Sequence, residues 1–165
     1  MQLLVVRHGI AEEREAWAPR DDALRPLTED GKKKLKEAAK GLRALVPRIN
    51  MLATSPLTRA MQTAQVLAKA YDKNEPVTVD ALAPGQRPPA VAEWLRKQTT
   101  KDTVALVGHE PGLGALISWL AAGIERSYIE LGKGGACLLD LGARIDAGEA
   151  MLIWALRPSQ LRALR

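Results

Sequence analysis

The chain has two histidines, and each comes directly after a short apolar run. His8 follows "LLVV" and Arg7, while His109 follows "VALVG". A further basic residue, Arg59, lies in "SPLTRA", just after another apolar stretch. A neutral imidazole can attack phosphorus as a nucleophile, and the planar fork of a guanidinium binds phosphate oxygens. These four residues therefore predict a site for a phosphoryl group.

His8 is the expected nucleophile of this site. Gly9 follows it directly, and a residue without a side chain leaves room for a ligand or for a close approach of the backbone. We expect Arg7 and Arg59 to bind the phosphate dianion and to neutralise charge that develops in the transition state. His109 would then hydrogen-bond the transferred oxygens.

Two further features belong to the same predicted rim. In "SPLTRA", Ser55 is the expected N-cap of a helix with Pro56 at its first position, and Pro111 is expected in that same position of a later helix. The free backbone N–H groups at the N-termini of these two helices could face the anion. Glu110, next to His109, is expected at the phosphate-binding edge of the site.

Acidic residues near these positions could donate a proton to a leaving group. Glu12 and Glu110 are both close in sequence to a predicted catalytic residue, and either could be the donor or could lie on the surface or the pocket rim. The segment "DALAPGQ" holds one acid, Asp80, which we expect on or beside a strand. No other donor is evident.

Two kinds of pattern alternate along the chain and predict the elements that position these residues. Short apolar and partly β-branched runs predict strands at 2–7, 50–54, 76–80 and 103–108. Apolar residues at helical spacing predict core-facing helices: Leu35, Ala38, Leu42 and Leu45; Leu57, Met61, Ala64 and Leu67 or Ala68; Ala92 and Leu95 within 88–99; and residues 112–122. "ACLLDL" and "AMLIWAL" predict a hairpin or two adjacent strands, followed by a short basic tail.

Alternation of strands and helices predicts a compact three-layer α/β/α fold with a mostly parallel central sheet. In such folds the ligand site lies outside the carboxyl ends of the strands. Both histidines and Arg59 follow predicted strands, so all three are expected on one rim of the sheet. A length of 165 residues fits a single domain over residues 1–165.

Composition limits the compartment and the partners. The chain is 47% hydrophobic and 26% charged, with no apolar run long enough to span a membrane and no leader before "MQLLVV", so we expect a cytoplasmic monomer.

The single cysteine, Cys137, is expected to be a small buried hydrophobe. Two histidines and one distant cysteine without tight ligand spacing argue against a metal site, and no cofactor is expected.

The net charge of +5 favours anionic partners. We do not expect nucleic acid among them, because aromatic residues for base stacking make up only 4% of the chain. Arg14, Arg20 and Arg25 lie in a loop-rich stretch, where they could line the approach of an acidic partner or serve solubility.

Three segments resemble the histidine phosphatase superfamily, which has the phosphoglycerate mutase-like fold. They are "VVRHGIA", "SPLTRAMQTA" and "VGHEPGL", and "RPLTEDG" at 25–31 is a further match. Within the superfamily, the short chain is similar to the compact SixA-type phosphohistidine phosphatases. The resemblance implies that His8 becomes transiently phosphorylated, that Arg7, Arg59 and His109 form the phosphate pocket, and that water releases phosphate without a metal.

The choice of substrate depends on the proton donor. A positioned general acid accelerates cleavage of an alkoxide leaving group by about 10²- to 10⁴-fold, whereas the imidazole of phosphohistidine can be protonated by solvent. We therefore expect the substrate to be phosphohistidine on a phosphotransfer or phosphocarrier protein. The alternatives are a small-molecule phosphomonoesterase for nucleotides or sugar phosphates, and a phosphate-binding module without catalysis.

Overall fold

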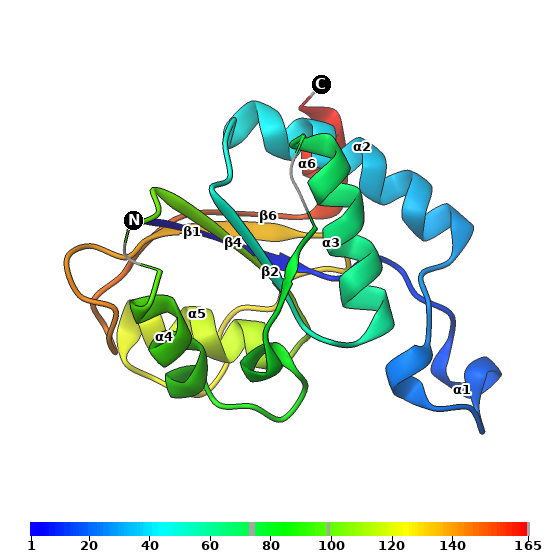
Figure 1. Cartoon of the computed structure of the whole chain (residues 1–165), viewed down its shortest axis with the longest axis horizontal. Coiled ribbons are helices and arrows are strands. Elements are labelled where there is room, and N and C mark those ends of the chain that lie inside the picture. The colour runs from blue at the N-terminus through cyan, green and yellow to red at the C-terminus, as the bar shows by residue number, and fades with distance from the viewer. Residues whose placement is uncertain (73–74, 99, 165) are drawn as a thin grey trace.

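The apolar runs form a six-stranded sheet in the computed structural model, which describes residues 1–72, 75–98 and 100–164. The spatial order is β3-β2-β4-β1-β5-β6 (Figure 1). The strands are β1 (Gln2–Arg7), β2 (Met51–Thr54), β3 (Val77–Thr78), β4 (Thr103–Gly108), β5 (Ala136–Asp140) and β6 (Met151–Leu156).

Most of this sheet is parallel, as the alternating pattern predicts. β1 pairs parallel with β4, β4 with β2, and β2 with β3. β5 is antiparallel to both of its neighbours, β1 and β6, so the last two strands form the predicted hairpin. The expected α/β fold class is confirmed, and β5 makes the sheet mixed.

Helices cover both faces of the sheet (Figure 1). One face carries α2, α3 and α6, and the other carries α4 and α5. The helices are α1 (Arg14–Trp17), α2 (Glu29–Leu45), α3 (Thr58–Ala70), α4 (Pro88–Arg96), α5 (Gly112–Ala122) and α6 (Pro158–Ala163), with short 3-10 turns η1 (Asp22–Leu24) and η2 (Asp80–Leu82).

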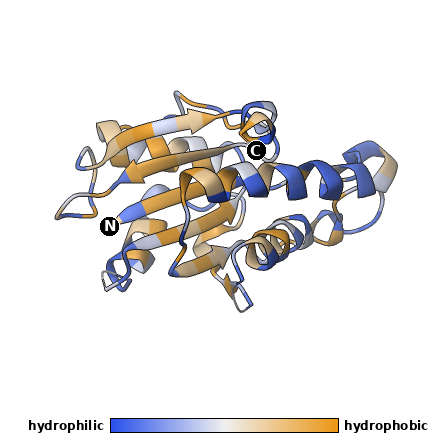
Figure 2. Cartoon of the chain, turned by 90° about the horizontal axis from the view of Figure 1, so that it is seen from above, coloured by the Kyte–Doolittle hydropathy of each residue, from blue (hydrophilic) through white to orange (hydrophobic). Residues whose placement is uncertain are grey.

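The core lies in two layers because alternate side chains of a strand point to opposite faces. Leu3 and Val5 of β1 pack with α4 and α5, whereas Leu4 and Val6 pack with α2 and α3. Figure 2, coloured by hydropathy, shows that the strands are largely hydrophobic, while much of α2 is hydrophilic. Cys137 is buried in β5, as expected for a small apolar side chain.

Several predicted boundaries differ from the structure. The strand predicted at 76–80 is reduced to Val77–Thr78, because the chain turns into η2 at Asp80. The helix predicted over 88–99 ends at Arg96, and its last predicted residue, Thr99, lies outside the described residues. Leu45 is exposed rather than core-facing, while Leu42 before it and Val46 after it are buried.

The predicted basic tail forms the helix α6. Leu161 is buried, and α6 packs against α2 at Gly41, where an added Cβ would overlap the carbonyl oxygen of Leu161. The buried side chain of Leu161 and the close approach at Gly41 thus fix where α6 lies on α2.

Candidate active site

The register of the parallel strands brings the predicted residues to one rim. Arg7 at the end of β1 is paired with Gly108 at the end of β4, so His8 and His109 leave the sheet side by side. Their ring centroids are 5.1 Å apart. Ser55, directly after β2, lies at the same rim because its backbone N–H donates to the carbonyl of Val107.

His8 is buried and neutral. Its Nδ1 lies 2.7 Å from the carbonyl oxygen of Gly9, which can only accept, so Nδ1 carries the proton and Nε2 keeps its lone pair. Burial lowers the pKa of His8 to about 4, against the hydrogen bond to Gly9, and the charges of Arg59 and Arg7 lower it further. The imidazole is therefore a free base at neutral pH, which is the form that can act as a nucleophile.

His109 is held by Ser55, which the sequence predicts as the N-cap of a helix. Nε2 of His109 lies 2.8 Å from the hydroxyl oxygen of Ser55. Burial lowers the pKa of His109 to about 3, and the nearby His8 and Arg59 add to this effect. Nδ1 of the same ring is buried and, within the described residues, has no hydrogen-bond partner.

The helix starts differ from the prediction. α3 begins at Thr58 with Leu57 as its N-cap, so Ser55 and Pro56 precede the helix, and the Ser55 hydroxyl contacts His109 instead. The Ser55 oxygen also accepts the backbone N–H of Leu57 at 3.3 Å. Pro111 is the N-cap of α5 rather than its first helical residue.

The two arginines approach the histidines from different elements. Arg7, at the end of β1, donates from Nη1 to the carbonyl of Leu131 at 2.6 Å. Arg59, in the first turn of α3, is almost fully buried and donates from Nη1 to the carbonyl of Asp22 at 2.9 Å. In each guanidinium, Nε is buried and has no partner among the described residues.

Buried donors without a partner are rare in folded proteins. In the described part of the chain there are four buried side-chain nitrogen or oxygen atoms without a hydrogen-bond partner, and three of them are Arg7 Nε, Arg59 Nε and His109 Nδ1. The fourth, the hydroxyl of Tyr71, belongs to the core cluster under α2 and α3. Unmet hydrogen-bonding capacity therefore collects at this rim, where an anion could satisfy it.

Gly9 contributes through its backbone. Its carbonyl accepts from His8, and its N–H donates to the hydroxyl of Thr63 at 3.0 Å; that hydroxyl donates in turn to the carbonyl of Arg59 at 2.7 Å. An added Cβ at Gly9 would meet leucine side chains at 3.5 Å, an ordinary contact. No backbone approaches Gly9 closely enough to require a glycine, so of the two expected reasons only room for a ligand stays a prediction.

The carboxylates near the site differ in their surroundings. Both oxygens of Glu110 accept backbone N–H groups, from Leu131 at 2.9 Å and from Gly114 at 3.0 Å. Glu12 and Asp80 are exposed. Glu110 is thus tied into the loop that holds Leu131, whose carbonyl in turn accepts from Arg7.

Asp22 and Arg25 are neighbours of the site. Asp22 is not predicted from the sequence, and Arg25 is expected from it to line the approach of a partner or to serve solubility. Arg25 is buried, and donates from Nε to Asp22 at 2.8 Å and from Nη1 to the carbonyl of Glu12 at 2.7 Å. Asp22 also lies 3.2 Å from Nη2 of Arg59. Burial acts to raise the pKa of Asp22, but the hydrogen bond from Arg25 and the charge of Arg59 hold it below its usual value.

A signal for Arg25 was present in the sequence, because it opens the segment "RPLTEDG". No pattern points to Asp22, whose partners are Arg25, directly after η1, Arg14 of α1 and Arg59 of α3. The other two arginines of that stretch lie farther out: Arg14 is 3.6 Å from Asp22, and Arg20 stacks 4.7 Å over the ring of Trp17.

The described residues include neither a membrane-spanning helix nor a metal-binding cluster. No helix among them has the length and apolar character needed to cross a membrane. No group of three or more histidine, cysteine, aspartate or glutamate side chains in those same ranges is arranged to hold a metal ion.

Comparisons with known proteins agree with this architecture. The model of the histidine phosphatase superfamily (branch 1) matches residues 3–83, a range that includes Arg7, His8 and Arg59. An uncharacterized protein of Picosynechococcus sp. is 38% identical over 150 residues, which cover 89% of this chain and 90% of that protein. The chain therefore belongs to branch 1 of the histidine phosphatase superfamily, and is a phosphatase by family.

Solved structures show the same fold at lower identity. The protein histidine phosphatase SixA, solved with tungstate, superposes with a TM-score of 0.83 at 22% identity, covering 98% of this chain and 99% of that one. The α-ribazole phosphatase of Shigella flexneri superposes with a TM-score of 0.76 at 15% identity, covering 96% of this chain and 97% of that one. The resemblance to the superfamily and to the phosphoglycerate mutase-like fold is thus confirmed.

Proposed function

We propose that this protein is a metal-independent phosphatase that forms a phosphohistidine on His8 and removes phosphate from phosphohistidine of other proteins. The observation that carries the proposal is the set of buried, unpartnered side-chain nitrogens of Arg7, Arg59 and His109 beside a neutral imidazole. Donors fixed before substrate arrives stabilise the charge of a transferring phosphoryl group without having to reorganise.

The reaction has two steps. In the first, the lone pair of His8 Nε2 attacks phosphorus and forms a P–N bond, while the bond between phosphorus and the partner's imidazole breaks. The departing imidazole keeps the electron pair of that bond and takes a proton from solvent. In the second step, water attacks the phosphorus on His8, Nε2 recovers its electron pair, and inorganic phosphate leaves.

The surroundings of the carboxylates favour a nitrogen leaving group. Glu110 uses both oxygens as acceptors of backbone N–H groups, and Asp22 is bound by Arg25 and Arg59. Glu12 and Asp80 are exposed. An alkoxide needs a positioned acid, and solvent can protonate an imidazole, so the site suits a phosphoramidate better than a phosphomonoester.

The fold neighbours support two substrate classes. SixA is a protein histidine phosphatase, which agrees with the proposal, whereas α-ribazole phosphatase acts on a small molecule. A small-molecule phosphomonoesterase is therefore the second candidate for this chain.

A direct comparison of substrates tests the proposal. We would measure kcat/KM for a histidine-phosphotransfer domain phosphorylated on its histidine, and for a panel of nucleotide and sugar phosphates, in the presence and absence of EDTA. The proposal predicts a preference for the phosphorylated domain and no effect of EDTA. A preference for a metabolite, binding of phosphate without turnover, or EDTA inhibition that added zinc or magnesium reverses would overturn it.

A further inference from the structure

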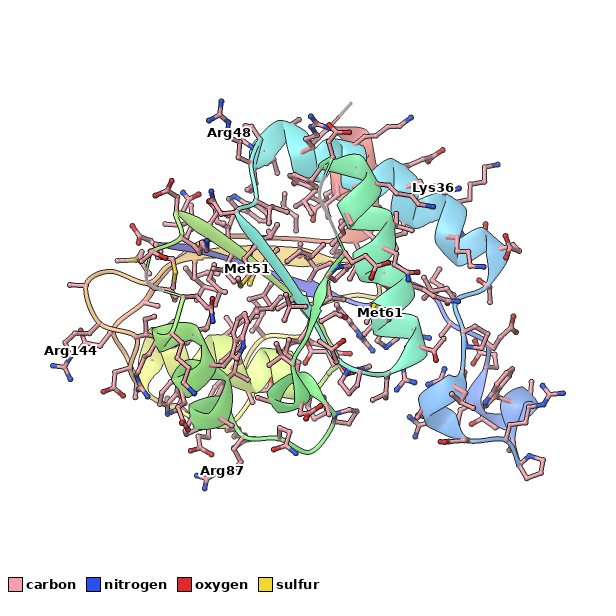
Figure 3. The ribbon with its side chains drawn as sticks, viewed as in Figure 1. Lys36, Arg48, Met51, Met61, Arg87 and Arg144 are labelled. Carbon is pink, nitrogen blue, oxygen red and sulfur yellow. The ribbon has the colours of Figure 1, made fainter. Side chains whose placement is uncertain are left out.

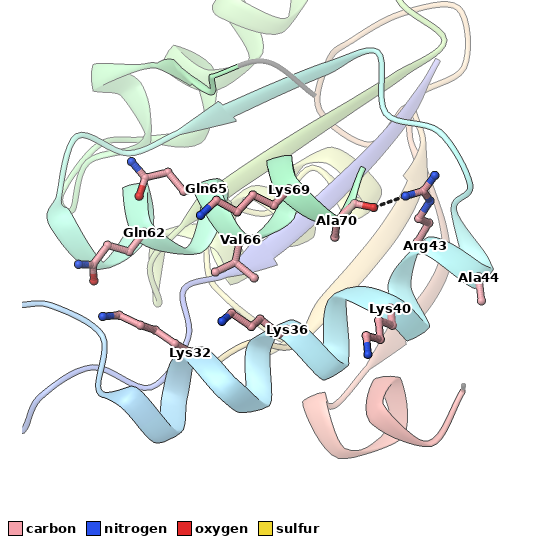
Figure 4. Close-up of a pocket in the computed structure, with 10 residues that line it drawn as sticks. All are labelled: Lys32, Lys36, Lys40, Arg43, Ala44, Gln62, Gln65, Val66, Lys69 and Ala70. Atoms are coloured by element: carbon pink, nitrogen blue, oxygen red, sulfur yellow. Dashed lines mark hydrogen bonds between the residues drawn. The ribbon is translucent and has the colours of Figure 1, made fainter. Parts of the chain in front are cut away.

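A basic groove runs between α2 and α3, the two helices that lie side by side on one face of the sheet (Figure 4). Its volume is about 880 Å³. Its charged walls are formed by Lys32, Lys36, Lys40 and Arg43 of α2 and by Lys69 of α3. We call this feature the α2/α3 groove.

The charge of the α2/α3 groove has one sign, because its lining includes no aspartate or glutamate. Lys32 is paired with Glu29 at 2.7 Å, and Arg43 with Asp72 at 3.0 Å. Lys36, Lys40 and Lys69 are exposed, and no carboxylate of the described residues lies within ion-pair distance of them. Three ammonium groups are thus available to an anionic partner.

The shape of the groove indicates what kind of partner fits. Lys32, Lys36 and Lys40 are spaced four residues apart, so they follow one face of α2 over about 12 Å. Val66 and the alanines 44 and 70 add apolar surface between the basic walls. A volume of this size takes about two turns of a helix with its side chains. Because the lining has no aromatic side chain for base stacking, an acidic amphipathic helix fits it better than a nucleic acid.

One end of the α2/α3 groove is linked to the candidate active site through helix α3. Gln62 of α3 lines the groove, and its side-chain oxygen accepts the backbone N–H of Leu27 at 2.7 Å. The next residue, Thr63, accepts the N–H of Gly9, directly after His8. Arg59 lies one turn earlier on the same helix. A partner seated at the Gln62 end of the groove therefore lies on the helix that carries Arg59 and Thr63, about one turn from the candidate site.

We propose that the α2/α3 groove docks an acidic amphipathic helix of the protein whose phosphohistidine enters the site. The proposal rests on the proposed function, to which it adds the surface that selects the partner. Docking is electrostatic, so it should lower KM for a protein substrate and leave the reaction of a small substrate unchanged.

The test uses two double charge reversals in the full chain. Lys36→Glu/Lys69→Glu alters both walls of the groove. Lys97→Glu/Lys101→Glu is the matched control, since it changes the net charge equally and follows α4 on the opposite face of the sheet. For each protein we would measure kcat and KM with a phosphorylated histidine-phosphotransfer domain and with free phosphohistidine, and confirm folding by thermal melting.

For the groove variant we expect KM for the phosphorylated domain to rise about tenfold, which corresponds to a loss of about 1.4 kcal/mol of binding free energy. Its kcat for the domain, and both constants for free phosphohistidine, should remain within about twofold, as should all constants of the control. Equal effects of the two double variants, or a loss with free phosphohistidine, would overturn the docking surface.

A binding measurement separates this inference from the proposed function. The probe is a fluorescein-labelled, helix-stapled peptide with glutamates on one face and leucines on the other, measured by anisotropy at two salt concentrations. Salt-sensitive binding that is lost only in Lys36→Glu/Lys69→Glu supports the groove, even if the phosphorylated domain is not a substrate. Failure of the peptide to bind, or tighter binding of a single-stranded RNA of equal charge, would overturn it.

Discussion

At the scale of single residues, the site is defined by which ring nitrogens carry protons. The carbonyl of Gly9 accepts from His8 Nδ1, and burial with two nearby guanidinium groups keeps the ring neutral. Ser55 holds the ring of His109 at Nε2 through a hydroxyl that can either donate or accept. Fixed tautomers matter because the nucleophilic nitrogen must present a lone pair to phosphorus.

The first prediction concerns the titration of the two histidines. Since burial lowers the pKa of His8 to about 4 and that of His109 to about 3, both rings should stay neutral at pH 5 and above. We would follow the Cε1–H resonances by NMR from pH 8 to about pH 3, with the variant His109→Gln to assign them. A midpoint near 6.5 for His8 would contradict the buried, neutral nucleophile.

The second prediction concerns Ser55 as a positioning residue for His109. Ser55→Ala removes the hydroxyl at 2.8 Å from Nε2, and we expect kcat/KM to fall about tenfold, the equivalent of one hydrogen bond. The pKa of His109 should shift in the same variant, which a loss of fold stability alone would not cause.

Ser118→Ala is the matched control for this experiment. It removes a buried hydroxyl of α5 that accepts the N–H of Tyr128. If both serine variants lower kcat/KM equally, or if the titration of His109 is unchanged in Ser55→Ala, the positioning role is wrong.

At the scale of elements, helix α3 connects the sheet to the site. Its first turn carries Arg59 and its second carries Thr63, which holds Gly9, so one helix fixes both an arginine and the backbone after the nucleophile. Behind it, α2 packs on α3 and is covered by α6. Figure 3 shows Met61 on α3, Met51 within the sheet and Lys36 on α2.

The third prediction concerns the packing of α6 on α2. Gly41→Ala places a Cβ where the carbonyl oxygen of Leu161 lies, so α6 must move. We expect the free energy of unfolding to fall by about 1–3 kcal/mol, measured by urea denaturation. Alanine otherwise stabilises a helix relative to glycine.

Gly112→Ala is the control for this loss, since an added Cβ at Gly112 meets nothing within 4 Å. A Gly41→Ala protein that is as stable as the wild type, or more so, would show that α6 is not docked as described.

At the scale of the whole molecule, much of the architecture could be predicted from periodicity. β1 and β4 have the predicted bounds, as does α5, because fully buried strands and an apolar helix are continuous apolar runs. β3 was overestimated because exposed Val77 and Thr78 have strand propensity but make only two pairs. α6 was missed although Pro158 opens it and the side chain of Gln160 accepts the backbone N–H of Arg157, both of which are local signals of a helix start.

In the candidate site, too, some features could be predicted from sequence patterns and others could not. The rim position of His8 and His109 follows from strand ends, which can be read in sequence. The partners of Asp22 could not be predicted in this way, because they join η1 to α3 across thirty-seven residues of chain, as the hydrogen bond from Arg59 shows. Ser55 was assigned to a cap because its sequence context suits one, whereas its hydroxyl is used by His109.

The fourth prediction concerns stability of the whole chain in acid. Between pH 6.5 and about pH 4, the unfolded chain protonates both histidines while the folded chain keeps them neutral, so the unfolded state binds more protons. The free energy of unfolding should therefore fall as the pH falls through this window, by about 1.4 kcal/mol per pH unit for each histidine at most. Urea denaturation at several pH values measures it.

The double variant His8→Gln/His109→Gln isolates the histidine contribution to this loss, because it leaves the carboxylates in place. Its unfolding free energy should depend less steeply on pH over that range than that of the wild type. Parallel curves for the two proteins would contradict neutral, buried histidines.

The central claim is that the phosphoryl group passes through His8. Rapid chemical quench of the protein with a ³²P-phosphorylated histidine-phosphotransfer domain, followed by peptide mapping, tests it most directly. We expect an acid-labile, base-stable label on the peptide that contains His8, formed and lost within one turnover and absent in His8→Ala. Turnover without any label on His8, or an equal label in His8→Ala, would contradict the account.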